Sequence, residues 1–208
     1  MLIDRSDNAI NLCEMKFYAS ELYFTKTILP MRQVIVYIAC SLDGYIAKPD
    51  GDINWLSMVE APPEDYGYAA FIQTVDTIVM GRKTYEKVLS FGIPWPHTGR
   101  KCYVLSKTRT GFDENVEFYG GDLGDLVAAL RQQEGGHIYC DGGGEVVHGL
   151  LKHGLADRYI VSIIPILLGD GIRLFKPGYP EQPLHLISSQ AYASGLVQLC
   201  YAPYHVYN

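Results

Sequence analysis

Residues 137–151 read HIYCDGGGEVVHGLL, and we take this stretch as the centre of the predicted fold. A short apolar run breaks at three consecutive glycines, and Val147, Leu150 and Leu151 then follow at helical spacing. The pattern predicts a strand, a tight turn and a helix. Glycines let a ligand approach the main chain closely, and the first N–H groups of a helix suit a phosphate. The alternative is a turn that needs glycine only for its positive φ and binds no ligand. The dinucleotide-binding pattern G-x-G-x-x-G is not met, because Val147 stands where its last glycine should be.

The composition predicts one domain with a real core, because the chain has 208 residues and is 48% hydrophobic. Its net charge of −6 argues against duplex nucleic acid as a partner. The basic residues are nevertheless concentrated in one segment, residues 82–109, in which Glu86 is the only acidic residue. Seven of the 17 Lys and Arg lie there: Arg82, Lys83, Lys87, Arg100, Lys101, Lys107 and Arg109. This segment favours a small anionic ligand, with a solvated charged face as the alternative.

The five cysteines are widely spaced and include no C-x-x-C, so we expect neither a disulfide framework nor a zinc site. The six histidines form no metal spacing, and we expect no metal. No stretch approaches the roughly 20 apolar residues of a membrane span, and the N-terminus makes a poor signal peptide. The prediction is a cytoplasmic protein with no membrane partner.

The chain divides into an N-terminal extension, residues 1–30, and one domain, residues 31–208. Alternating elements within the domain predict an α/β fold, with a mainly parallel sheet covered by helices on both faces. Prolines 62 and 63 predict the start of a helix whose apolar face is Phe71, Ile72 and Val75. The other expected elements are strands at 34–40, 77–80, 101–106, 116–119 and 157–164, helices at 82–89 and 123–130, and a hairpin of 184–187 with 196–202.

Three of these strands end in corners suited to an anion: Gly81-Arg-Lys-Thr84, Ser106-Lys-Thr108 and the triple glycine 142–144. Ligands of such sheets bind beyond the carboxyl ends of the strands. Three such corners therefore predict a dinucleotide. Two basic corners beside the glycine turn favour NADP over NAD.

The sequence resembles the dihydrofolate reductase superfamily, most closely the reductase domain of bifunctional riboflavin-biosynthesis enzymes and its stand-alone relatives. The matching pieces occur in the family's order and cover residues 31 to about 203. They are SLDGYIA at 41–47, DTIVMGRKTYE at 76–86, YVLSKT at 103–108, DGGGEVVHGLLKHGLAD at 141–157 and PILLGDGIRLF at 165–175. The resemblance implies a three-layer, NADP-binding fold around a mixed eight-stranded sheet.

The resemblance also implies a set of cofactor-binding residues. Arg82 would meet the 2′-phosphate, and Ala39 and Ile46 would lie along the nicotinamide, although both are core-type residues. The remaining expected contacts are Gly81, Lys83 and Thr84 at the phosphates, Leu105, Ser106 and Lys107 near the adenosine ribose, and Gly142, Gly143, Gly144, Glu145 and Val146 around the pyrophosphate.

Two carboxylates are candidates for proton delivery during hydride transfer. Asp141 directly precedes the glycine turn, where riboflavin-type reductases carry an acid, but it could instead bond to N–H groups of its own turn. Asp65 lies six residues before Phe71, a spacing that does not quite match true dihydrofolate reductases, and it could be only a helix N-terminal charge. Asp43 and Trp55 are candidates for substrate contact, and Asp43 could also fix its loop.

The functional hypothesis is an NADPH-dependent reductase of a small pyrimidine- or pteridine-like substrate, similar to 5-amino-6-(5-phosphoribosylamino)uracil reductases. The chain lacks the H-x-E and P-C-x-x-C signatures of the fused zinc deaminase, so a role in riboflavin synthesis does not follow. The alternatives are an authentic dihydrofolate reductase and a non-catalytic NADP-binding protein. The resemblance implies a homodimer, for which the apolar strand 159–168 could supply an interface.

Overall fold

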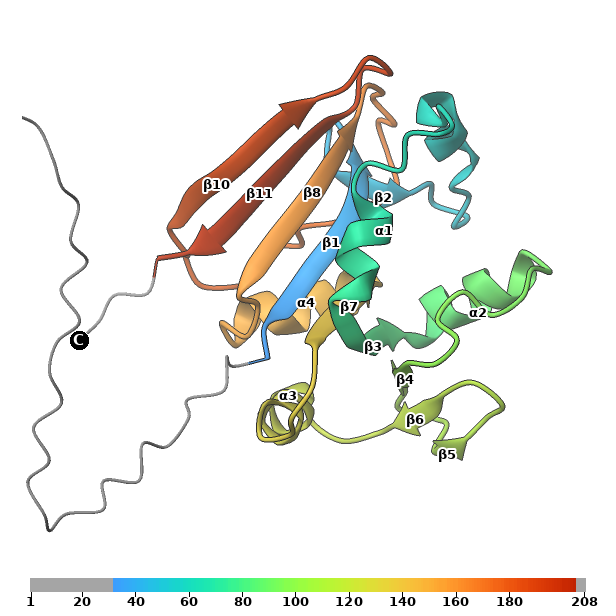
Figure 1. The fold of residues 1–208 in the computed structure, drawn as a ribbon, viewed down its shortest axis with the longest axis vertical. Helices are drawn as coiled ribbons and strands as arrows, with labels where there is room; N and C mark the ends of the chain where they lie inside the picture. Colours follow the sequence, from blue (N-terminus) through green and yellow to red (C-terminus); the bar gives the residue numbers. More distant parts are fainter. Residues whose placement is uncertain (1–31, 205–208) are drawn as a thin grey trace, which may run out of the picture.

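A computed structural model describes residues 32–204, which form a sheet of nine strands with a smaller two-stranded sheet at one end (Figure 1). The extension expected at 1–30 lies outside the described residues. Across the sheet the strands run β10 (Leu184–Ala191), β11 (Val197–Pro203), β8 (Arg158–Ile164), β1 (Val34–Ser41), β7 (His137–Gly142), β3 (Val75–Gly81), β4 (Lys101–Leu105), β6 (Glu117–Tyr119) and β5 (Gly111–Phe112).

The centre of the sheet is parallel and its two edges are antiparallel. Strands β8, β1, β7, β3, β4 and β6 pair in parallel, whereas β10 and β11 add an antiparallel edge and β5 closes the other. The expected α/β class with a mixed, mainly parallel sheet is confirmed. The ninth strand is β5, which covers two residues and carries no apolar run long enough to predict.

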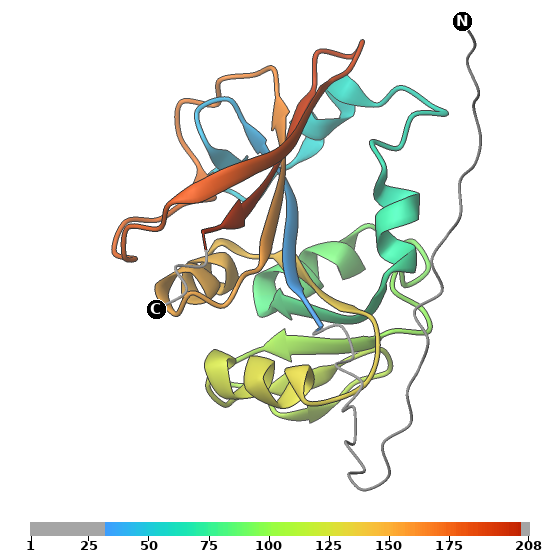
Figure 2. The same ribbon diagram turned by 60° about the vertical axis from the view of Figure 1, so that its left-hand side comes forward.

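Helices cover both faces because the central strands are apolar on both. Val79 and Cys140 pack on the face covered by α3 (Leu123–Arg131) and α4 (Gly144–Lys152). Their neighbours Met80 and Tyr139 point to the other face, against α1 (Tyr68–Gln73) and Tyr85 of α2 (Arg82–Ser90). Figures 1 and 2 show α1 and α4 on opposite sides of β1.

The helix expected to open at prolines 62 and 63 begins instead at Tyr68, so that prediction is wrong. Tyr66 has φ of 58° and Gly67 has φ of 81°, and two successive left-handed residues keep the preceding turn out of the helix. Val75, expected on the helix, is the first residue of β3. The small sheet of β2 (Tyr45–Ala47) and β9 (Ile172–Arg173) and the 3₁₀ helix η1 (Asn54–Val59) were not predicted.

The start of α3 follows the prediction. The Asp122 carboxylate accepts hydrogen bonds from the N–H groups of Gly124 and Asp125, as an N-cap does. Leu126, Val127 and Leu130 are buried against the sheet.

Four cysteines of the described residues carry free thiols, as expected. Burial raises the pKa of Cys40 and Cys102 to about 11 and that of Cys140 to about 12, so these thiols stay protonated and behave as apolar core groups. Cys200, on β11, is half-buried, and Cys13 lies outside the described residues. None of the helices within 32–204 is long and apolar enough to cross a membrane.

Candidate active site

A cleft of about 1700 Å³ opens where the central parallel strands end. Its floor includes Gly81 at the end of β3, Leu105 at the end of β4 and Gly142 at the end of β7. Because β3 pairs in parallel with both β4 and β7, the three predicted corners lie side by side. All fourteen residues expected at the cofactor line this one cleft.

Two helices begin at the cleft, and neither start is capped by a side chain. Helix α2 follows Gly81 and α4 follows Gly143, and no side-chain hydrogen bond satisfies either first turn. The first N–H groups of an uncapped helix are free donors at the positive end of its dipole. The pair of helix starts therefore suits an anion that carries more than one phosphate.

The glycine turn brings main chains too close together for side chains. A Cβ on Gly143 would lie 3.2 Å from the Thr84 hydroxyl and 3.5 Å from the Gly81 Cα, and φ of Gly143 is +87°. A Cβ on Gly144 would lie 2.9 Å from the carbonyl oxygen of Arg173. Gly143 is therefore required by its positive φ, and both glycines are required because neighbouring atoms leave no room for a Cβ.

Cationic side chains are concentrated around the two helix starts. The predicted Arg82, Lys83 and Lys107 line the cleft. Sequence reasoning did not assign Lys87, Arg173 and Lys176 to the site, yet these also line it. Arg82 is half-exposed, and its Nη1 lies 3.7 Å from Glu86 Oε1. Because this ion pair is long and exposed, the guanidinium can still pair with a phosphate.

Several polar contacts hold the cleft walls in shape. The Ser106 hydroxyl accepts hydrogen bonds from the N–H groups of Thr108 and Arg109 and so fixes the basic corner after β4. Lys176 pairs with Glu145, and this contact lowers the pKa of that carboxyl. Donors, cations and side-chain-free main chain therefore fit the phosphates of a dinucleotide.

Asp141 lies at the cleft and is held by two side chains, one from its own strand β7 and one from a distant loop. His97 Nε2 lies 2.9 Å from Asp141 Oδ2, and the Tyr139 hydroxyl donates to Asp141 Oδ1 over 2.6 Å. The His97 side chain is 2% exposed and that of Asp141 is 19% exposed, so the carboxylate faces the cleft while its partner is buried behind it. Asp141 thus bonds to these side chains and not to N–H groups of its own turn.

Tyr139 stays neutral and acts as a donor because burial, followed by the charge of Asp141, raises its pKa well above the ordinary value. His97 comes from the loop between α2 and β4 and packs edge-on to Trp95, with ring centroids 5.4 Å apart. Sequence reasoning gave His97 no role. No spacing rule links residues 44 positions apart, so a single sequence carries no signal for this pair.

Asp65, unlike Asp141, does not line the main cleft, and its carboxylate has a structural role. Its carboxylate accepts hydrogen bonds from the N–H groups of Ala69 and Gly67, which lower its pKa and fix the start of α1. The structure thus places it as a helix N-terminal charge, beside a smaller hollow described below, and not at the main cleft.

Asp43 and Trp55, expected at the substrate, line neither hollow. Asp43 accepts hydrogen bonds from Ser41 and from the N–H groups of Leu168 and Gly169, so it ties the turn after β1 to the segment before β9. Trp55 is buried in a small cluster with Val59, Ile164 and Leu196. No group of His, Cys, Asp and Glu within 32–204 is arranged to hold a metal ion.

Residues 32–198 match the family model of the RibD C-terminal domain. The uncharacterized Bacillus subtilis (strain 168) proteins YwjB and YyaP are 39% and 29% identical over 171 and 185 residues, which span 82% and 83% of this chain and 97% and 96% of theirs. A crystal structure from Shewanella sp. PV-4, named for riboflavin biosynthesis, is 36% identical with a TM-score of 0.77 over 83% of this chain and 99% of that one.

Two more distant crystal structures share the fold alone. A pyrimidine reductase-like protein of Corynebacterium diphtheriae is 19% identical with a TM-score of 0.61, over 84% of this chain and 92% of that one. A Thermotoga maritima diaminohydroxyphosphoribosylaminopyrimidine deaminase/5-amino-6-(5-phosphoribosylamino)uracil reductase is 14% identical with a TM-score of 0.62, over 83% of this chain and 57% of that one. Sequence and fold agree: the chain belongs to the RibD C-terminal domain family, a dihydrofolate reductase-like family of NADPH-dependent reductases.

Proposed function

We propose that this chain is an NADPH-dependent oxidoreductase that reduces a small pyrimidine- or pteridine-like heterocycle by hydride transfer. The observation that carries the proposal is one cleft that combines two uncapped helix starts and a group of cations with a carboxylate held by two donors. The bound nicotinamide would supply the hydride.

The chain's own residues divide the work of holding the cofactor. Residues 142–146 and 81–84 would bind the phosphates through main-chain donors, and Arg82 would pair with the 2′-phosphate. Leu105, Ser106 and Lys107 would border the adenosine ribose. Ala39 and Ile46, both on the cleft wall, would hold one face of the nicotinamide.

Asp141 would act on the ring that receives the hydride. Reduction of a ring C=N bond also needs a proton at nitrogen. Asp141 faces the cleft, and His97 Nε2 lies 2.9 Å behind its carboxylate oxygen Oδ2. The hydrogen bond between them holds a proton next to the carboxylate that would face the ring nitrogen. Asp65 is less suited to this role because its carboxylate accepts hydrogen bonds from the N–H groups of Gly67 and Ala69 at the start of α1.

The first test is a thermal-shift titration with NADPH and NADH. A ligand at 100 times its dissociation constant adds about 2.7 kcal/mol to the apparent stability. We expect a clear shift with NADPH, a smaller one with NADH, and loss of the NADPH preference in Arg82→Ala. The control is Lys152→Ala, at the exposed far end of α4, which should keep the preference. No shift with either nucleotide would refute the enzyme hypothesis.

The second test is a turnover screen with pyrimidines, pteridines and dihydrofolate, followed as the oxidation of NADPH by absorbance. We expect turnover of a pyrimidine or pteridine and none of dihydrofolate, and no such turnover in Asp141→Asn. Efficient turnover of dihydrofolate would instead favour an authentic dihydrofolate reductase. NADPH binding without turnover of any compound would favour a non-catalytic NADP-binding protein.

We also propose a homodimer, at a different place from the strand expected to form it. Strand β8 is paired on both sides, by β1 and β11, so its backbone cannot extend a sheet across an interface. The edge strand β10 exposes Leu184, Leu186 and Ile187. Sedimentation should give twice the chain mass, and Ile187→Lys should give a monomer, whereas the neighbouring Ser188→Lys should not. A wild-type monomer at micromolar concentration would refute the dimer.

A further inference from the structure

A second, smaller hollow adjoins the main cleft on the side of α1 and η1. It measures about 320 Å³ and shares Tyr37, Ala39 and Tyr139 with the cleft. Beyond these shared residues it extends along Tyr66, Tyr68 and Ser162. The hollow is therefore reached from the cleft near the residues assigned to the nicotinamide and lies outside the part that holds the cations.

Flat aromatic surfaces form much of the wall. The rings of Tyr37 and Tyr68 lie with centroids 5.8 Å apart, and those of Tyr68 and Tyr139 lie 6.4 Å apart. Burial, followed by the charge of Asp141, raises the pKa of Tyr68 to about 12, so its hydroxyl is a neutral donor at physiological pH. That hydroxyl has no hydrogen-bond partner within residues 32–204, and it remains free to bond to a ligand.

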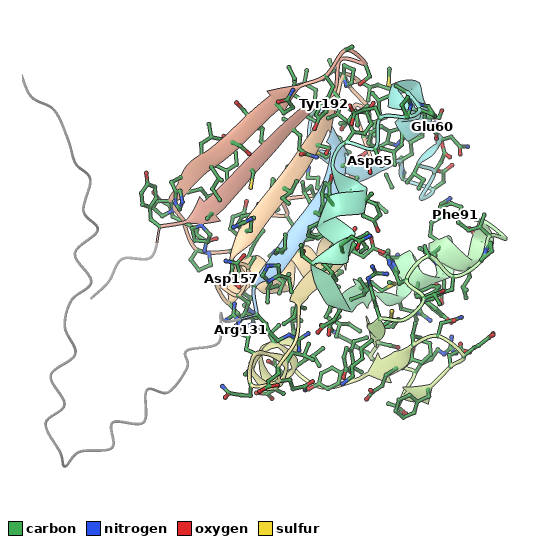
Figure 3. The ribbon with its side chains drawn as sticks, in the orientation of Figure 1. Glu60, Asp65, Phe91, Arg131, Asp157 and Tyr192 are labelled. Carbon is green, nitrogen blue, oxygen red and sulfur yellow. The ribbon has the colours of Figure 1, made fainter. Side chains whose placement is uncertain are left out.

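The charges of the hollow are all negative. Its charged lining residues are Glu60 and Asp65, both on the segment between η1 and α1 (Figure 3), and no Lys or Arg of the described chain lines it. Asp141 is close enough for its charge to raise the pKa of Tyr68. Arg100 does not line the hollow and donates to the carbonyl oxygens of Val75 and Ile72. Its positive charge lowers the pKa of Tyr68, but less than the charge of Asp141 raises it.

Asp141 lines the main cleft and is bonded to Tyr139, which lines both the cleft and the hollow, so it also limits what a ligand in the hollow can present toward the cleft. An ionised carboxylate accepts about four hydrogen bonds, and His97 and Tyr139 fill one position on each oxygen. The remaining positions face the cleft and call for a donor. A ring N–H meets that demand, whereas a phosphate oxygen would be repelled.

We infer that the hollow is a substrate subsite for an uncharged planar ring that presents an N–H to Asp141 and carries no phosphate. This inference rests on the proposed function and narrows it, because it excludes a phosphorylated pyrimidine as the preferred substrate. A phosphate monoester carries a charge of about −1.5 to −2 at pH 7 and would add it beside three carboxylates. The cations of the main cleft serve the cofactor.

The test compares uridine with uridine 5′-phosphate by calorimetric titration of protein saturated with NADP⁺. Uridine should bind at least threefold more tightly, and Asp141→Asn should weaken its binding. Equal or tighter binding of the phosphate, or no binding of uridine, would overturn the inference. The proposed function is tested separately by the NADPH titration, which involves no ring ligand.

A charge-reversal pair sharpens the test. Glu60→Lys places a cation on the hollow and should improve the affinity for uridine 5′-phosphate relative to uridine at least threefold. The control Glu181→Lys makes the same charge change at an exposed residue that lines neither hollow, and it should leave the ratio unchanged. An equal response of both variants would also overturn the inference, since the effect would then come from net charge alone.

Discussion

The two ends of the active-site region differ in what they are made of. The end that we propose for the phosphates, the phosphate end, consists of main-chain donors at the starts of α2 and α4, and Arg82 and Lys107 are among the cations that line it. The ring end consists of tyrosine side chains and carboxylates. The main cleft is thus lined by both signs of charge, with Glu86 and Glu145 among its cations, whereas the charged residues that line the hollow are Glu60 and Asp65 alone.

The two ends also differ in how they are supported. The phosphate end depends on backbone geometry, which one added methyl group can disturb. The ring end depends on side-chain hydrogen bonds that reach Asp141 from His97 and Tyr139. Substitutions should accordingly affect the two ends in different ways.

The largest effect is expected from Gly143→Ala. The new Cβ would be strained by φ of +87° and would crowd Thr84 and Gly81, so NADPH affinity should fall at least tenfold and stability by about 1–2 kcal/mol. The matched control is Gly154→Ala, which has φ of +60° and nothing within 4 Å. It should lose some stability through backbone strain alone but bind NADPH normally. Loss of binding in both variants would show that backbone strain alone is responsible.

The next effect concerns His97. His97→Leu removes a donor from a carboxylate that is mostly shielded, and should cost about 1–3 kcal/mol in the free energy of unfolding at pH 7. It should also slow turnover of the substrate found in the screen by at least tenfold, with little change in NADPH affinity. His97→Gln can still donate an N–H to Asp141 and should therefore keep much of the stability and much of the turnover rate. Equal loss in the two variants would mean that His97 serves packing and not the position of Asp141.

The smallest effect concerns Asp43, which ties the turn after β1 to the segment before β9. The hydrogen bond from Ser41, with help from Gly169 and Leu168, lowers the pKa of Asp43 to about 2. A carboxyl whose folded pKa is depressed stabilises the protein above its unfolded pKa of about 4 and loses that contribution as pH falls toward 2. Asp43→Asn should therefore be less stable than the parent at pH 7 and approach it in acid.

Denaturant unfolding between pH 7 and pH 2 measures this difference. The exposed Asp50→Asn, after β2, is the matched control and should follow the parent throughout. A constant difference between Asp43→Asn and the parent at every pH would contradict the linkage.

The phosphate end could be predicted from the sequence because its residues are contiguous. Three strand-and-corner motifs each combine an apolar run with glycine or basic residues, and the parallel pairing of β3 with β4 and β7 brings them together. The same reasoning found the central strands and the capped start of α3.

The ring end could not be predicted in the same way. The bond between His97 and Asp141 joins residues from distant elements, and nothing local to either one implies the other. Asp65 was one of two candidates for proton delivery, with a helix N-terminal charge as the alternative, and its hydrogen bonds to the start of α1 support that alternative. The left-handed conformations of Tyr66 and Gly67, which shape this turn, were not expected. A tyrosine with positive φ is a tertiary result that propensity does not foresee.

The buried cysteines give this protein a set of internal reporters. A protonated thiol reacts with alkylating reagents only after it is exposed, so the labelling rate of each cysteine measures how often its strand opens. Cys140 on the central strand β7 should be labelled only through global unfolding, whereas the half-buried Cys200 on β11 should be labelled through local fraying. Labelling with and without NADPH would then show which strands the cofactor stabilises, in the unmodified protein and without any knowledge of its substrate.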